Sequence, residues 1–290
     1  MNLHPGPDDE AAFQALLDYI RQERGLDCRQ YKPNYLRRRL AVRMRALRVQ
    51  SYAEYMAYLV TCEAEYERLF TALTINLSYF FRDASLYQAL REEVLPALLK
   101  ARHQTCRLRI WSAGCAGGEE PYSLAILLQE LLSHQQTTWQ LHIYATDIDG
   151  AVLERARRGR FSHFSLQNVD EHYTSRYFTL DGNEYILIPT IRNMVEFQQA
   201  DLNQMTVGPV SDLILCRNVL IYFTKAQQER LFHLFHRTLP DDGVLVIGKT
   251  EILPLNLLHL FQPLNRREHI YAKTQEPIPQ PPLRGLAGKK

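Results

Sequence analysis

A glycine-rich segment is the first candidate for chemistry in this sequence. Residues 112–121 read SAGCAGGEEP and lie between a short apolar strand candidate and a helical pattern. Glycines allow the tight turn and the close backbone approach that a nucleotide needs at such a junction. Pro121 suits the first turn of the helix that follows. The segment therefore predicts a nucleotide-type site, and an ordinary tight turn between strand and helix is the alternative.

Two acidic residues at the start of that helix narrow the choice of ligand. Glu119 and Glu120 would repel a pyrophosphate at a helix N-terminus, and the segment lacks the Lys-Ser/Thr ending of a P-loop. S-adenosylmethionine, a sulfonium nucleoside without phosphate, fits better. Asp147, at the end of the next strand candidate, can accept both ribose hydroxyls. The acids favour a methyl-donor site over a dinucleotide site.

A block of basic residues near the N-terminus is the second candidate. Between Arg21 and Gln50, ten basic and two acidic residues give a charge of +8, so the rest of the chain carries −6 within a total of +2. Arg39 and Arg43 lie beside a helical apolar stripe. The opposite face of the helix carries four arginines: Arg37, Arg38, Arg45 and Arg48. This asymmetry predicts an acidic partner. A merely solvated helix face and a nucleic acid are the alternatives, but no nucleic-acid motif accompanies the block.

Hydrophobic periodicity divides the chain into helical and alternating parts. Residues 9–72 and 84–101 read as helices. Strand candidates and helix candidates then alternate, which predicts βαβ units and a parallel sheet. The strands are expected at residues 108–111, 141–146, 194–198, 212–216 and 244–248, and the helices at 119–132, 150–158 and 225–239. The pattern breaks at 159–193, where a turn at 181–183 precedes a strand at 185–188.

The expected fold is α/β, with a small N-terminal all-α domain followed by a doubly wound, Rossmann-like domain. The boundaries are residues 1–83 for the helical domain, 84–107 for a linker helix and hinge, 108–273 for the α/β domain with an inserted β-subdomain at 159–193, and 274–290 for a disordered Pro/Gly tail. That tail is too polar and too rich in proline to bury a core.

Composition excludes several other classes of protein. Apolar residues make up 46% and charged residues 23% of the 290 residues, which is ordinary globular composition. No run approaches the roughly 18 apolar residues of a membrane helix, and the acidic start is no signal peptide. Five scattered cysteines indicate free thiols and a cytoplasmic location. His233 and His236 share a helix face without a third ligand, so we expect no metal site. A monomer is expected.

Several motifs, in order, identify a family. They are residues 74–83 (TINLSYFFRD), 111–115 (WSAGC), 118–123 (GEEPYS), 145–149 (ATDID) and 216–223 (CRNVLIYF), with Gly243, Gly248 and Thr250-Glu251. Over about residues 10–273 the chain resembles the chemotaxis receptor glutamate O-methyltransferases, the CheR family. These enzymes methylate glutamate side chains on chemoreceptors.

The resemblance implies a fold, a reaction and a set of site residues. The donor S-adenosylmethionine, which becomes S-adenosylhomocysteine, would be bound by nine residues: Asn76, Ser78, Arg82, Glu120, Asp147, Asp201, Leu202, Arg217 and Asn218. Arg82 and Tyr222 would be catalytic, and no metal would be needed. Ser78 replaces the family's usual Thr and keeps its hydroxyl, and Asp201 replaces a common Asn, which exchanges a hydrogen-bond donor for an acceptor.

The expected acceptor is the acidic helical cytoplasmic region of a chemoreceptor, without nucleic acid and without membrane insertion. A donor-binding but inactive scaffold and a nucleic-acid methyltransferase are the alternatives. Some members of the family also grip a receptor C-terminal pentapeptide with the β-subdomain. Because the turn at 180–184 is short, we expect this chain to do without that tether and to recognise the receptor through its basic helix.

Overall fold

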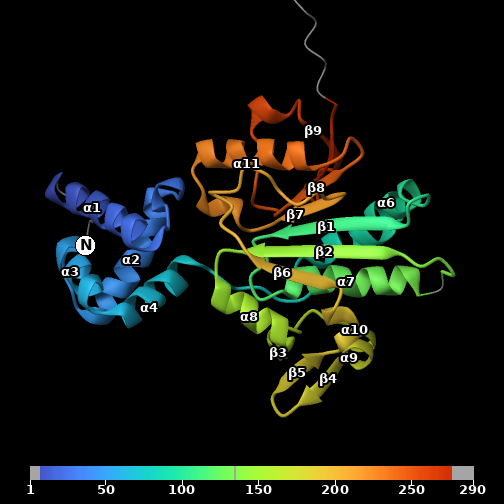
Figure 1. Ribbon diagram of the computed structural model, residues 1–290, viewed down its shortest axis with the longest axis horizontal. Coiled ribbons are helices and arrows are strands. Elements are labelled where there is room, and N and C mark those ends of the chain that lie inside the picture. Colours follow the sequence, from blue (N-terminus) through green and yellow to red (C-terminus); the bar gives the residue numbers. More distant parts are fainter. Residues whose placement is uncertain (1–6, 134, 276–290) are drawn as a thin grey trace, which may run out of the picture.

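The computed structural model describes residues 7–133 and 135–275. Figure 1 shows a helical N-terminal domain in blue, a large twisted sheet with helices on both faces, and a small sheet below it. This arrangement confirms the predicted fold class, a helical domain followed by a Rossmann-like domain. The predicted tail falls largely on residues 276–290, which lie outside the described residues.

The N-terminal domain consists of four helices around one core. They are α1 (Pro7–Arg24), α2 (Pro33–Leu47), α3 (Tyr52–Thr61) and α4 (Glu63–Leu73), with the short η1 (Cys28–Gln30) between α1 and α2. Pro33 stands in the first turn of α2, where a missing N–H costs nothing. The Ser51 side chain caps α3. The predicted apolar stripe supplies fully buried Leu36 and Leu40 to this core.

One charged group lies at the centre of the helical domain. Glu65 has no exposed surface, and its carboxylate accepts two hydrogen bonds from Arg43, at 2.9 and 2.7 Å. The Tyr55 hydroxyl donates a third, at 3.0 Å. Arg43, which the sequence places beside the apolar stripe, thus turns towards the interior of the domain and keeps only 18% of its side chain exposed.

The large sheet has the order β6-β2-β1-β7-β8-β10-β9. The five strands from β6 to β8 are parallel, as predicted. β10 pairs antiparallel with β8, and β9 pairs antiparallel with β10. Their bounds are β1 (Arg107–Ala113), β2 (Gln140–Asp147), β6 (Val195–Gln199), β7 (Leu213–Cys216), β8 (Val244–Ile247), β9 (Phe261–Asn265) and β10 (Ile270–Lys273). The sequence did not predict β9 and β10. An edge strand with a proline, Pro263, gives a weak strand signal.

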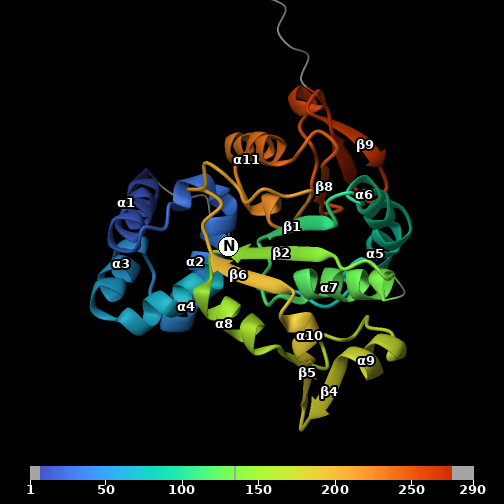
Figure 2. The ribbon, with the colours of Figure 1, turned by 45° about the vertical axis from the view of Figure 1, so that its right-hand side comes forward.

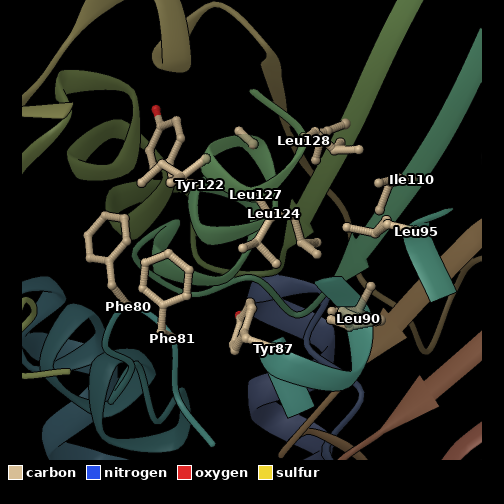
Figure 3. Close-up of a cluster of buried hydrophobic side chains, with 14 of the residues drawn as sticks. Phe80, Phe81, Tyr87, Leu90, Leu95, Ile110, Tyr122, Leu124, Leu127 and Leu128 are labelled. Carbon is tan, nitrogen blue, oxygen red and sulfur yellow. The ribbon is translucent and has the colours of Figure 1, made fainter. Parts of the chain in front are cut away.

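Two helical layers cover the sheet. On one face lie α7 (Glu119–Leu132) and a continuous helical stretch of α5 (Ala84–Ala89), the π-helical η2 (Leu90–Val94) and α6 (Leu95–Ala101). Figure 3 shows this stretch meeting α7 and β1 through Tyr87, Leu90, Leu95, Leu124 and Ile110. On the other face α11 (Lys225–Thr238) packs with η4 (Leu255–Leu257). The helix expected as a linker thus contributes to the core of the α/β domain.

The inserted segment forms a separate three-stranded antiparallel sheet of order β3-β5-β4. It follows α8 (Gly150–Arg158) and contains β3 (Arg160–Ser162), α9 (Glu171–Tyr177), β4 (Phe178–Asp181), β5 (Glu184–Leu187) and α10 (Pro189–Arg192). Gly182, with a φ of +61°, begins the short turn between β4 and β5. The predicted turn and strand are confirmed to within one residue.

The N-terminal domain lies at the end of the sheet towards which β1 and β2 run, as both Figure 1 and Figure 2 show. No helix within residues 7–133 and 135–275 is long and apolar enough to cross a membrane.

The Arg43–Glu65 pair gives a prediction about stability. Arg43→Met would leave the buried Glu65 carboxylate without the cation that hydrogen-bonds to it, with only the exposed Arg68 still 3.9 Å away, and breaking such a buried pair costs about 3–5 kcal/mol. We expect that loss in the free energy of unfolding from urea titrations. Arg45→Met, on the exposed face of the same helix, is the control and should change stability by less than about 0.5 kcal/mol. Equal effects of the two substitutions would contradict a structural role for the pair.

Candidate functional site

A cavity lies where the parallel strands end. The chain passes from β1 outwards to β2 and β6 and then returns to the other side of β1 as β7. Such a switch point is where open α/β sheets bind ligands. All ten residues predicted for donor binding and catalysis line this one cavity: Asn76, Ser78, Arg82, Glu120, Asp147, Asp201, Leu202, Arg217, Asn218 and Tyr222. They come from sequence positions almost 150 residues apart.

The glycine loop brings the backbone close to this cavity. Gly114 has a φ of +79°, and a Cβ there would lie 2.4 Å from the Val219 side chain. The N–H groups of Gly114 and Cys115 donate to the Thr146 carbonyl, at 2.8 and 3.0 Å. This ties the loop to the end of β2. Gly114 is therefore required both by its backbone conformation and by the space that Val219 occupies.

Asp147 joins the two strand ends. Its carboxylate accepts the backbone N–H groups of Ala116 and Asp149, at 2.8 and 3.0 Å. Burial raises the pKa of Asp147, while those two N–H groups oppose the rise. A carboxylate has about four acceptor sites, so capacity remains for hydroxyls of a ligand.

Asp149 supports the site through Asn76, a role that sequence reasoning missed. Its side chain caps α8 by accepting the N–H groups of Ala151 and Val152, and it also accepts the Asn76 amide at 2.7 Å. The predicted ligand residue Asn76 thus spends one donor on a neighbouring carboxylate. The signal available in the sequence was an Asp directly before a predicted helix, the usual place for a cap.

An ionic cluster forms the wall behind Arg82. The Glu120 carboxylate accepts from the Ser112 hydroxyl at 2.7 Å and from Arg217 at 3.1 Å. Arg217 also pairs with Asp83 and donates to the Arg82 carbonyl at 3.0 Å. Burial lowers the pKa of Arg217, but Glu120, Tyr87 and Asp83 more than compensate, so the guanidinium stays charged. Its hydrogen bonds go to protein groups, although the residue lines the cavity.

The helical domain completes the cavity. Tyr31 lines it from the segment before α2, and Tyr31 pairs with Phe223 in a short antiparallel bridge. The N–H of Lys32 donates to the Tyr222 carbonyl at 2.8 Å, and the Lys32 ammonium donates to the Ile221 carbonyl at 2.9 Å. No sequence signal pointed to Tyr31, because the bridge joins residues almost 200 positions apart.

Tyr222 is held at the cavity from several directions. The centre of its ring lies 4.8 Å from the ring centre of Tyr35 on α2. Burial raises the pKa of Tyr222 although Arg39 and Arg82 oppose the rise, so the hydroxyl remains protonated near neutral pH. The loop before it, which contains the short η3 (Leu220–Tyr222), is fixed by Glu251, whose carboxylate accepts the N–H of Val219 at 2.9 Å.

The basic face of α2 differs from expectation at one position. Arg38, Arg45 and Arg48 are exposed. Arg37 is instead paired with Glu10, and its guanidinium lies 3.9 Å from the ring centre of Phe13, so its side chain is only 20% exposed. A cation packed on a ring has less freedom to meet a partner. Arg39 faces Tyr35 and Tyr222 rather than solvent.

The chemistry of the lining suits a cationic nucleoside. Glu120, Asp147 and Asp201 are acidic, which disfavours phosphate and favours a cation and hydroxyl donors. Burial raises the pKa of Asp201, and the Asn203 N–H, 2.8 Å away, opposes the rise. Within the described part of the chain, no cluster of His, Cys, Asp and Glu has the geometry for a metal ion.

Comparison with known proteins agrees with this geometry. Two family descriptions match: "CheR methyltransferase, all-alpha domain" over residues 11–74 and "CheR methyltransferase, SAM binding domain" over residues 76–270. Chemotaxis protein methyltransferase 2 of Vibrio cholerae is 36% identical, covering 82% of this chain and 84% of that protein. The chemotaxis protein methyltransferase of Salmonella typhimurium is 33% identical, covering 92% and 91%. That of Listeria monocytogenes is 32% identical, covering 84% and 91%.

Among solved structures, SAM-bound CalS10, an amino pentose methyltransferase from Micromonospora echinaspora, has a TM-score of 0.32. It is 18% identical, covering 58% of this chain and 52% of that one. This structural similarity is too low to support an argument about function.

The position of Asp147 gives a prediction about ligand binding. We expect S-adenosylhomocysteine to bind without added metal, and Asp147→Asn to weaken binding about 10- to 100-fold, or about 1–3 kcal/mol, through loss of a charge-assisted hydrogen bond. Calorimetry measures both. Asp241→Asn, an exposed position before β8, is the control. An unchanged dissociation constant for Asp147→Asn would remove this residue from the site.

Proposed function

Because the chain belongs to the CheR methyltransferase family, and is therefore an S-adenosylmethionine-dependent methyltransferase, we propose that it methylates glutamate side chains of chemoreceptors. The products are glutamyl methyl esters and S-adenosylhomocysteine. One observation carries the proposal. Arg82, Tyr222 and the acidic residues expected to bind the methyl donor line a single cavity next to α2. The proposed setting is the cytoplasm.

A glutamate acceptor needs little from the protein in acid–base chemistry. Its carboxylate is ionised at neutral pH, since the ordinary pKa is about 4.3. When bound, S-adenosylmethionine supplies a methyl group on a sulfonium. A carboxylate oxygen forms the new bond to the methyl carbon as the carbon–sulfur bond breaks. No general base is required, so the protein's contribution is orientation and exclusion of water.

Arg82 and Tyr222 are the groups placed to orient the acceptor. The guanidinium of Arg82 is anchored by one hydrogen bond, to the Leu77 carbonyl at 3.2 Å, and lies 5.7 Å from the Tyr79 ring centre. A guanidinium has five N–H donors, so donors remain for a carboxylate. The protonated hydroxyl of Tyr222 adds a neutral donor at the same cavity.

The proposed reaction is tested with a labelled methyl donor. Purified receptor cytoplasmic domains should become labelled, and mild base should release the label as methanol, because the product is an ester. Arg82→Ala should lower turnover by about 10²-fold or more while the thermal midpoint changes little, since this side chain is partly exposed. Label that resists base, or label in RNA instead of receptor, would contradict the proposed acceptor.

We propose that the receptor docks on the exposed arginines of α2, namely Arg38, Arg45 and Arg48. They have the opposite sign to an acidic receptor helix, and α2 begins directly after the bridge to the Tyr222 loop. Arg37 stays in the proposal as a weaker contributor, because Glu10 already neutralises it.

Charge reversal tests this docking face. Arg45→Glu with Arg48→Glu should raise the receptor KM and flatten its dependence on salt, because surface charge steers the encounter. The dissociation constant of S-adenosylhomocysteine should stay the same. Arg266→Glu with Arg267→Glu, in the exposed turn between β9 and β10, makes the same change in net charge and is the control. An equal rise in KM for both pairs would indicate a general effect of charge.

We also propose that receptor docking does not depend on a tether at the β-subdomain. The turn between β4 and β5 consists only of Gly182 and Asn183, which leaves little loop to enclose a peptide. Titration with the receptor's C-terminal pentapeptide should give no saturable binding at micromolar concentration. Micromolar binding that maps to residues 159–193 would refute this proposal.

A further inference from the structure

Arg82 belongs to a backbone segment that is fixed by hydrogen bonds from other parts of the chain. The Phe80 N–H donates to the Ser165 carbonyl at 2.8 Å, and the Phe81 N–H donates to the Ser123 hydroxyl at 3.0 Å. The residues on either side of Arg82 both have positive φ, +52° at Phe81 and +67° at Asp83. Non-glycine residues keep this conformation only where their surroundings enforce it. The direction in which Arg82 leaves the backbone therefore depends on these contacts.

The contact on the C-terminal side of Arg82 is made by Arg217. The Arg217 side chain is 3% exposed and comes from the end of β7. One end of its guanidinium donates to Glu120, at the start of α7. The other end donates to the Arg82 carbonyl at 3.0 Å and pairs with the Asp83 carboxylate. Arg217 thus connects the 82–83 peptide to both the sheet and α7.

The Asp83 carboxylate orients the Nη2 end of the Arg217 guanidinium. Removal of one partner of a buried ion pair leaves the remaining charge poorly compensated. Glu120 serves only Nη1, and Asp83 serves Nη2. Without the charge of Asp83, Nη2 loses the partner that keeps it beside the Arg82 carbonyl. Asp83 is not one of the described residues that line the cavity. It therefore acts through Arg217 and not on a ligand.

We infer that Asp83 is a positioning residue, which fixes the backbone of Arg82 through Arg217 so that the Arg82 guanidinium reaches the cavity. The inference rests on the proposed function, because a role of Arg82 in turnover is part of that proposal. Asp83 would then influence the reaction without contacting the methyl donor or the acceptor.

A double-mutant cycle tests the inference. Wild type, Asp83→Asn, Arg82→Ala and the double variant are compared by kcat and KM with a receptor domain. We expect Asp83→Asn to lower kcat about 10- to 100-fold with little change in receptor KM. In the Arg82→Ala background the same substitution should cost less than about two-fold, because nothing is left to position. Losses that multiply, or a wild-type kcat for Asp83→Asn, would overturn the inference.

Two further variants separate positioning from folding. Asp83→Glu keeps the charge and should recover most of kcat. Asp242→Asn removes a comparable partner, because Asp242 pairs with Arg102 at the opposite end of the strands, and it should leave kcat and KM unchanged. If Asp83→Asn does not fold, Arg217→Lys takes its place in the cycle. A lysine keeps the charge but cannot bridge Glu120, Asp83 and the Arg82 carbonyl together, so the same non-additive loss is expected.

The inference can fail separately from the proposed function. If wild type labels no receptor domain, the proposed acceptor is wrong, and the same four proteins are then compared by their affinity for S-adenosylhomocysteine, since Arg82 lines that cavity. Non-additive losses of affinity would support the positioning role of Asp83. Additive losses, or no loss, would overturn it whatever the acceptor is.

Discussion

The burial of the Arg217 guanidinium is the constraint on which this site depends. A cation removed from water needs acceptors close by, and here they come from two separate parts of the chain: Glu120 on α7, and the Arg82–Asp83 segment before α5, through the Arg82 carbonyl and the Asp83 carboxylate. Movement of either part alone would cost the guanidinium one of its two carboxylate partners. The same interaction that stabilises the α/β domain therefore also sets the geometry behind the cavity.

How far the sequence predicts this protein depends on the range of the interaction concerned. The α/β elements were predicted closely because their signals are local: α7 and α8 have the predicted bounds, since Pro121 and Asp149 mark their first turns. The hairpin of β9 and β10 was missed because its stability comes from pairing with β8 and not from its own pattern. The ten cavity residues were predicted from a family resemblance, and spacing alone supports only the glycine loop and Asp147.

Side-chain direction was less predictable than element type. Arg37 was placed on the solvent face by its helical position, yet Phe13 and Glu10 from α1 hold it. Arg217 lines the cavity as expected, and the ion pairs that its two terminal nitrogens make with Glu120 and Asp83 were not predicted. Tyr31 gave no sequence signal for its place in the site, and Glu251 was noted only as part of a family motif, without its role in fixing the Tyr222 loop. In each case the deciding partner lies in another element, which periodicity cannot show.

Both domains contribute residues to the lining of the one cavity described above. The backbone of Gln30 and Lys32 pairs with the loop that carries Tyr222, and α2 starts at the next residue. The helix proposed to dock an acidic partner is thus anchored to the loop proposed to orient its carboxylate. An acceptor bound along the arginines of α2, as proposed, would be held at a fixed distance from Tyr222 by a few hydrogen bonds. Positioning is the main contribution that the proposed reaction, which needs no general base, would ask of the protein, and this short bridge would then link docking to positioning.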